Sequence, residues 1–215
     1  MEYSQQVSVN TLQRLPTYLN YLKSLNREGN ISSTEIAKAL RLNDVQVRKD
    51  LSAVSSGGRP KVGYNIQGLI ADLKEFLGYN AVNDAVMVGC GNLGRALMSY
   101  RGFSEYGLRI VAGFDISEDL FGSDTGGKPI LPLRELSEYC RKNGIKIGVI
   151  TTPAQEAQRV CDLLIAGGIK AIWNFAPAHI TVGEGVLVQH ENMACSLALL
   201  SKHLNEMLSE QKNEL

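Results

Sequence analysis

The chain has 215 residues, 44% of them hydrophobic and 20% charged, which is the composition of an ordinary globular protein with room for one large or two modest cores. Its net charge is zero, no apolar stretch approaches the roughly 20 residues of a membrane-spanning helix, and the first residues lack a signal-peptide pattern, so we expect a cytoplasmic protein. The four scattered cysteines include no CxxC pair and no neighbouring histidine, which argues against a zinc site and a disulfide framework.

Helical patterns occupy the first part of the chain. Leucines at intervals of three and four over 12–25 predict an amphipathic helix. Two shorter helices are expected over 32–40 and 44–54, because a polar cap residue followed three positions later by Glu or Gln stands at the start of each. A three-residue turn, 41–43, separates them, so the pair has the organisation of a helix-turn-helix DNA-binding motif.

The second helix of this pair presents polar and basic side chains to solvent. Arg48 can bind guanine through two hydrogen bonds, Gln46 can bind adenine, and Lys49 suits a phosphate. The stretch 41–64 carries five basic side chains against two acidic ones, although a solvated helix face is the simpler explanation of them. The glycine-rich segment 55–66 is either a β-hairpin wing or a linker. The candidate DNA-binding residues are Ser32, Ser33, Gln46, Arg48, Lys49, Arg59, Lys61 and Tyr64.

The remainder of the chain has the pattern of an α/β domain. A helix over 68–78 ends at a glycine and closes the first domain. Strand-like and helical runs then alternate, which predicts a Rossmann-type parallel sheet with helices on its faces. The strands are expected over 84–89, 108–115, 144–153, 168–177 and 186–189, with helices over 90–100 and 154–168.

A glycine-rich loop follows the first of these strands. Gly89, Gly91 and Gly94 match the pattern G-x-G-x-x-G, which here ends a strand and opens a helix. The first glycine allows a tight turn, the second lets the backbone approach a pyrophosphate, and the third lets helix and strand pack closely. Asp115 ends the next strand at the distance expected for a carboxylate that binds ribose hydroxyls. No arginine directly follows it, so we expect NAD rather than NADP.

The ends of the later strands supply candidates for the nicotinamide side of this site. The carboxyl ends of parallel strands line the ligand crevice of a doubly wound sheet, although the same residues can be simple turns. The candidate cofactor-binding residues from this reasoning are Gly89, Cys90, Gly91, Gly94, Asp115, Ile116, Thr151, Thr152, Pro153, Asn174, Phe175, Ala176 and Pro177.

The second domain offers little for catalysis. A dehydrogenase needs a proton donor or acceptor and usually a domain that holds its substrate, whereas 80–190 has room for the nucleotide fold and little else. For each of the three histidines, a surface or helix-capping role is preferred to a catalytic one. We therefore expect no enzyme activity, no catalytic residue and no metal, and interpret the nucleotide as a signal.

A long amphipathic helix is expected at the end of the chain. Asn192 can cap it, and the residues Met193, Leu197, Leu200, Leu204 and Met207 alternate steps of four and three, forming a seam for another helix. A helix-turn-helix protein usually binds two half-sites as a twofold dimer, so this helix is the candidate for dimerisation. A helix that covers the core of its own domain is the alternative.

Motifs along essentially the whole chain point to one family. They are RLPTYLNYL, SSTEIAKAL, VQVRKDLS, GYNIQGL, VGCGNLGRAL, GFD, TTPAQEAQ, NFAP and the terminal leucine helix. Together they resemble the Rex redox-sensing transcriptional repressors. The resemblance implies a winged-helix DNA-binding domain over 1–79, a Rossmann domain for NADH and NAD+ over 80–190, and a helix over 191–215 that is exchanged between the subunits of a homodimer. It also implies that the dimer holds a palindromic operator and that NADH releases it.

The resemblance also implies roles for individual residues. Asn92 and Leu93 belong with the glycines and Asp115 in the adenosine and pyrophosphate site. Tyr100 resembles the family's switch tyrosine, and Arg14 in the first helix resembles a basic residue of the same interdomain network. The implied operator contacts are Arg48, Lys49, Arg59 and Lys61.

The chain departs from the family pattern at three places. Many members carry an acid at the start of the final helix, where this chain has Asn192 with Glu191 beside it, which leaves open which of the two takes part in the switch. The wing lacks the phenylalanine and glycine run of many members, and Cys90 replaces a commoner small residue. The alternatives are a small NAD-dependent oxidoreductase, a sensor of another nucleotide such as CoA, and a thiol switch at Cys90.

Overall fold

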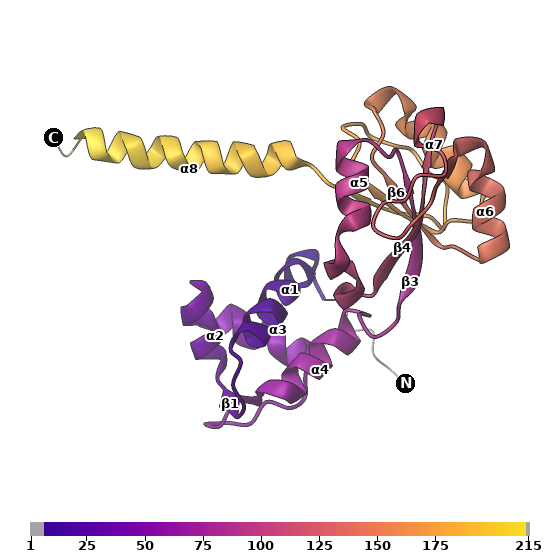
Figure 1. Ribbon diagram of the computed structural model, residues 1–215. Coiled ribbons are helices and arrows are strands. Elements are labelled where there is room, and N and C mark those ends of the chain that lie inside the picture. The colour runs from indigo at the N-terminus through magenta and orange to yellow at the C-terminus, as the bar shows by residue number, and fades with distance from the viewer. Residues whose placement is uncertain (1–6, 214–215) are drawn as a thin grey trace. The chain divides into compact units, whose positions relative to one another are not determined.

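The computed structural model describes residues 7–213 and divides the chain into two compact units, Met1–Ala81 and Val82–Leu215. The first is helical with a small two-stranded sheet, and the second contains a parallel sheet with helices on both faces (Figure 1). Each unit has hydrophobic clusters of its own.

Four helices build the first unit around a core of leucine, isoleucine and valine side chains, with Tyr18 the largest fully buried residue. The elements are α1 (Val9–Ser24), β1 (Asn30–Ile31), α2 (Ser33–Leu40), α3 (Asp44–Val54), β2 (Tyr64–Asn65) and α4 (Ile66–Phe76). The predicted helices are confirmed. Leu12, however, is 41% exposed, because Thr11 and Leu15 occupy the inward face of α1 instead.

Only half of each predicted capping box forms at the starts of α2 and α3. The Ser32 hydroxyl accepts a hydrogen bond from the backbone N–H of Glu35 at 3.0 Å, and the Asn43 side-chain oxygen accepts from that of Gln46 at 3.1 Å. The return bonds are replaced, because the Glu35 carboxylate pairs with Arg27 and the Gln46 amide donates to Asp50. The caps therefore fix the helix starts while leaving these two side chains for other contacts.

A short hairpin follows α3. The backbone N–H of Arg59 donates to the carbonyl oxygen of Gly63 at 2.9 Å and Gly63 donates back at 2.9 Å. Between them Lys61 has a φ of 63°, the left-handed conformation of a tight turn. Strand β2 then pairs antiparallel with β1, so this segment is a wing and not a linker.

A six-stranded parallel sheet forms the centre of the second unit. Its strands lie in the order β5-β4-β3-β6-β7-β8, so the direction of winding reverses between β3 and β6, which is the arrangement of a Rossmann fold. The strands are β3 (Asn83–Val88), β4 (Leu108–Asp115), β5 (Ile130–Pro132), β6 (Ile147–Ile150), β7 (Ala171–Asn174) and β8 (Leu187–His190).

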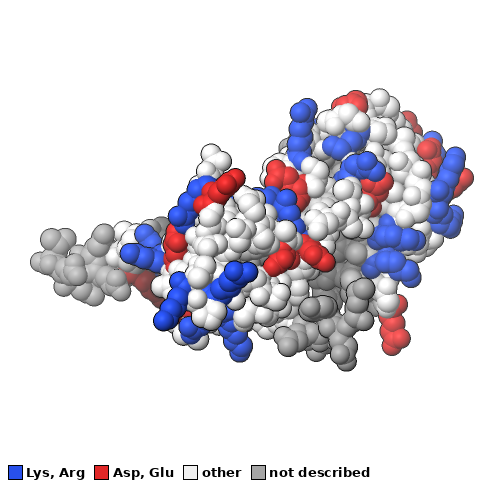
Figure 2. All heavy atoms as spheres, turned by 90° about the horizontal axis from the view of Figure 1, so that it is seen from below, with Lys and Arg blue, Asp and Glu red and all other residues white. Residues whose placement is uncertain are grey.

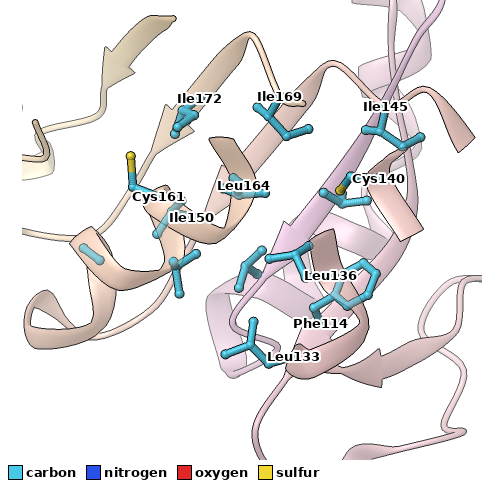
Figure 3. Packing of buried hydrophobic residues seen from close by; sticks show 14 of the residues in the cluster. Phe114, Leu133, Leu136, Cys140, Ile145, Ile150, Cys161, Leu164, Ile169 and Ile172 are labelled. Carbon is cyan, nitrogen blue, oxygen red and sulfur yellow. The ribbon is translucent and has the colours of Figure 1, made fainter. Parts of the chain in front are cut away.

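The two faces of this sheet are covered separately. Helices α6 (Leu136–Asn143) and α7 (Ala157–Ala166) bury one face, with Leu136, Cys140 and Leu164 among the side chains packed there (Figure 3). Helix α5 (Asn92–Ser99) and the 3-10 helix η1 (Arg101–Tyr106) cover the other, around Met87 and Met98. Alternate residues of β3 serve opposite faces, as the pleat of a strand requires.

One strand and one α-helix of this unit were not predicted from the sequence. Strand β5 has three residues and lies at the edge of the sheet, where Pro132 can be accommodated because no further strand needs its missing N–H. Helix α6 buries only Leu136 and Cys140 and has no side-chain cap. Segments this short give too few apolar positions to reveal a period.

Helix α8 (Met193–Asn213) is the last element that the structure describes. The Asn192 side-chain oxygen accepts hydrogen bonds from the backbone N–H groups of Ala194 at 3.1 Å and Cys195 at 3.3 Å, so Asn192 is its cap. Every side chain over 193–209 is exposed, including the whole seam of Met193, Leu197 and the leucines beyond. Among residues 7–213, no helix has the length and hydropathy needed to cross a membrane.

Candidate functional site

The glycine loop after β3 lies at the point where the sheet reverses its winding. Gly89 has a φ of +92°, and a Cβ atom there would lie 2.9 Å from the carbonyl group of Thr151 at the end of β6. A Cβ atom on Gly94 would lie 2.0 Å from the Gly89 carbonyl oxygen, so only glycine lets α5 start this close to the loop. Around Gly91 no atom lies within 4 Å of the same position. The loop therefore combines two closed positions with one that faces open space.

Asp115 lies beside this loop at the end of β4. One carboxylate oxygen accepts a hydrogen bond from the backbone N–H of Cys90 at 2.6 Å, and the other accepts from that of Ser117 at 2.9 Å. These bonds hold the carboxylate in one orientation. Each oxygen of an ionised carboxylate can accept a further bond, so the group retains capacity for two hydroxyls of a ligand.

A cavity of about 580 Å³ opens beside the loop and the carboxylate. This volume is within the range of small-molecule sites, and the walls are mostly apolar. The hydroxyl oxygen of Thr152 is buried at the cavity and has no hydrogen-bond partner among the described residues, so it is a polar group available to a ligand. The predicted residues that line the cavity are Gly89, Gly91, Leu93, Asp115, Ile116, Thr151, Thr152, Pro153, Phe175 and Pro177.

The walls of the cavity also include residues that sequence reasoning missed. Leu133, Glu156, Val160 and Met193 of α8 also line the cavity. The first three come from the short segment after β5 and from the start of α7. Glu156 lies in the run TTPAQEAQ and Met193 in the terminal seam, but neither pattern marks a cavity residue, because these side chains reach the cavity only through the folding of the sheet.

Cys90 lies in the loop, but its thiol is turned away from the cavity. The side chain is fully buried, with its sulfur 3.9 Å from the Met98 sulfur and 3.7 Å from the Phe114 carbonyl oxygen. Burial, reinforced by the nearby Asp115 carboxylate, raises the pKa of this thiol to about 12. A thiolate is the reactive form of cysteine, so this environment disfavours a thiol switch at Cys90. Its predicted cofactor role is reduced to its backbone, which orients Asp115.

Asn174 and Ala176 were predicted at the nicotinamide side, and the structure places neither side chain on the cavity. The Asn174 amide is fully buried, where its oxygen accepts from the backbone N–H of Ala176 at 3.0 Å and its nitrogen donates to the Ala178 carbonyl oxygen at 2.9 Å. Asn174 thus holds the loop that presents Phe175 and Pro177. The prediction is corrected from ligand contact to loop support.

Two further predicted residues lie at opposite ends of α5. Asn92 is in the first turn, where its side-chain oxygen accepts from Arg95 at 3.3 Å. Tyr100 follows the last turn, is 53% exposed and contacts Phe103, so within one chain it is not part of the cavity wall. The Glu191 carboxylate accepts a hydrogen bond from the Trp173 indole at 2.8 Å, whereas the Asn192 side chain caps α8. The two neighbours therefore make different contacts.

In the first unit, a buried carboxylate organises the predicted DNA-reading helix. Asp50 of α3 is 2% exposed and accepts hydrogen bonds from Gln46 at 2.9 Å, Tyr18 at 2.8 Å and Thr11 at 3.1 Å. Arg14 of α1 donates to both of its oxygens, at 2.8 and 3.0 Å. Burial alone would raise the pKa of Asp50, but these hydrogen bonds, with that of Arg14 the strongest, hold it below its ordinary value.

The predicted basic operator contacts of this unit face solvent. Arg48 and Lys49 are exposed on α3, as are Arg59 and Lys61 on the wing. In the view of Figure 2 basic and acidic side chains are interspersed, in keeping with the net charge of zero. Gln46 is exposed, but its amide is engaged by Asp50, so its freedom to read a base is limited.

The remaining DNA-binding candidates differ in their availability. Tyr64 is only 7% exposed and packs in the core of the first unit, so its prediction as a DNA contact is wrong for the side chain. The Ser32 hydroxyl is occupied in capping α2, and Ser33 is the first residue of that helix. The apolar residue Ile66, two positions after Tyr64, indicated that this side chain could point into the core. The hairpin geometry that turns the ring inward could not be read from the sequence.

Comparison with known proteins gives matches along the chain. The family model for a CoA binding domain matches residues 80–178, and that for a putative DNA-binding protein N-terminus matches residues 6–52. Proteins described as redox-sensing transcriptional repressor Rex are similar to this chain. The one from Bacteroides fragilis is 41% identical over 94% of this chain and 93% of its own length, and the one from Treponema denticola is 38% identical over 91% and 94%.

Solved structures give the same result for the fold. A crystal structure of the repressor RSP in complex with β-NAD+ and operator DNA has a TM-score of 0.88 and 32% identity, covering 98% of this chain and 98% of its own. A structure of RSP in complex with β-NADH has a TM-score of 0.87 and 32% identity, covering 97% and 99%.

Proposed function

The chain belongs to the Rex family of redox-sensing transcriptional repressors, and on that premise we propose which of its residues bind the nucleotide, the operator and a second subunit. It is an NAD(H)-sensing, DNA-binding repressor and not an enzyme. We propose that its Rossmann unit binds the nucleotide and that its winged-helix unit binds the operator. Because its partner is genomic operator DNA, we place its action in the cytoplasm.

The nucleotide binds in the cavity at the reversal point of the sheet. Asp115 accepts the ribose hydroxyls of the adenosine, and the open position at Gly91 with the start of α5 receives the pyrophosphate. Thr152, Phe175 and Pro177 face the nicotinamide half. The observation that supports this most strongly is the open Gly91 position next to a fixed carboxylate on a cavity of about 580 Å³. No reaction takes place at the bound nicotinamide, and the protein responds only to whether the ring is oxidised or reduced.

The operator is bound by α3 and the wing. Arg48 and Lys49 are exposed on the helix that follows the tight turn, and Arg59 and Lys61 are exposed on the hairpin. Arginine suits guanine edges, and lysine suits phosphates. A second chain joins through α8, because its exposed apolar seam matches the steps of four and three at which helices pack together. We propose that the segment 191–215, which contains this helix, is exchanged between subunits.

A gel-shift experiment with a twofold-symmetric operator tests this function. We expect the chain to retard the DNA alone and with NAD+, and NADH to release it, while CoA has no effect because Asp115 repels a phosphate on the ribose. Equal effects of NADH and NAD+ would refute redox sensing. A nucleotide changes operator binding only as far as its affinity differs between the DNA-binding and released states of the protein, so a redox sensor needs this difference to be larger for NADH. The variant Asp115→Ala should bind the operator but respond weakly to NADH.

A further inference from the structure

Four aromatic rings form a continuous row from the nucleotide cavity to the end of α5. Phe175 lines the cavity, and its ring centroid lies 4.7 Å from that of Trp173. Trp173 in turn lies 5.6 Å from Phe103, and Phe103 lies 4.9 Å from Tyr100, both edge to face. These separations are within the range of about 4.5–7 Å over which aromatic rings attract each other. The four rings therefore form an unbroken series of contacts between the cavity and the end of α5.

Trp173 has a second contact, with the base of α8. Its indole N–H donates to the Glu191 carboxylate at 2.8 Å. The backbone N–H of Glu191 donates to the Asn174 carbonyl oxygen at 2.8 Å, so Glu191 is fixed through both its main chain and its side chain. The helix cap Asn192 follows directly, and Met193, the first residue of α8, lines the nucleotide cavity.

The core of the unit does not require this hydrogen bond. Ile172 and Asn174, on either side in β7, are buried, whereas Trp173 is half-buried and Glu191 is exposed. An indole N–H at such a position can be satisfied by water. The bond to a charged acceptor therefore does more than satisfy a buried donor, because it fixes the chain segment that leads into α8.

We infer that Trp173 is a positioning residue that couples the nucleotide cavity to the base of the dimer helix, through its ring contact with Phe175 and its hydrogen bond to Glu191. This inference rests on the proposed function. NADH and NAD+ differ at the nicotinamide, the half of the ligand that Phe175 faces. A shift of Phe175 changes its contact with Trp173, and with it the bond that holds Glu191 and the start of α8.

The test measures how strongly the two nucleotides differ in their effect on DNA binding. The readout is the operator Kd at saturating NADH divided by the operator Kd at saturating NAD+. In Glu191→Ala, which removes the acceptor, and Trp173→Phe, which keeps a ring and removes the donor, we expect this ratio to fall about three- to tenfold, the effect of one hydrogen bond. Glu191→Gln keeps an oxygen acceptor but loses its charge, so its ratio should fall less than that of Glu191→Ala.

Two further measurements separate coupling from stability. Glu184→Ala changes an exposed acid in the loop before β8 and serves as the matched control, with the wild-type ratio expected. The melting temperature and the NADH Kd of each variant show whether fold and binding persist. A wild-type ratio in both Glu191→Ala and Trp173→Phe, even with a lowered melting temperature, overturns the inference alone. A ratio of one in the wild-type chain overturns the proposed function and this inference with it.

Discussion

Replacing Asp115 by alanine should separate nucleotide sensing from DNA binding. The carboxylate lies on the nucleotide cavity and keeps acceptor capacity for ribose hydroxyls beyond its two backbone bonds. A hydrogen bond to a charged group contributes about 1.5–3 kcal/mol, which is roughly a 10- to 150-fold change in affinity. We expect the NADH Kd, measured by calorimetric titration, to rise by this factor.

The operator affinity of Asp115→Ala without nucleotide should stay within about twofold of wild type, because Asp115 and the basic residues of α3 lie in different compact units. Asp115→Asn retains one oxygen that can accept a backbone N–H, so it distinguishes loss of ribose binding from loss of loop order. Asp119→Ala, an exposed acid four residues away, is the matched control for a lost charge. An unchanged NADH Kd in Asp115→Ala would refute the ribose contact.

Three more predictions follow from the buried carboxylate, the exposed seam and the buried thiol. Because the pKa of Asp50 is depressed, its contribution to stability is present above the unfolded-state value of about 4 and is lost as pH falls through the lower folded value. The melting temperature of Asp50→Asn should therefore depend less on pH in this acid range than that of the wild type, and equal slopes would contradict the assignment. Leu200→Glu places a charge in the seam of α8, so it should shift the chain toward monomers in analytical ultracentrifugation and weaken operator binding at least tenfold, whereas Lys202→Glu on the same helix should have a smaller effect. Iodoacetamide near neutral pH should leave Cys90 unmodified in the folded chain, as peptide mass mapping would detect, because burial raises its pKa to about 12.

The glycine loop and its acid could be predicted because their chemistry depends on local backbone geometry. Gly89 and Gly94 are closed positions and Gly91 is an open one, as the spacing indicated. Leu133 and Val160 could not be predicted as cavity residues, since their place depends on how α6 and α7 pack on the sheet. The same limit applies to β5, which has three residues and shows no alternation.

The first unit shows the same division between local and long-range information. The caps Ser32 and Asn43 place two helix starts from the sequence alone. In the sequence Asp50 is one of the two acids in the basic stretch 41–64, and only the packing of α1 against α3 makes it the acceptor for Arg14. Tyr64 was grouped with the basic residues around it, but the turn of the wing directs its ring into the core.

The exposed seam of α8 links repression to the number of protein molecules in a cell. Seven large apolar side chains between Met193 and Leu208 contact water in a single chain, and a second copy that covers them gains the free energy of their burial. Assembly of two chains depends on the square of their concentration. At chain concentrations near the dimer dissociation constant, occupancy of the operator therefore rises more steeply with copy number than that of a monomeric repressor.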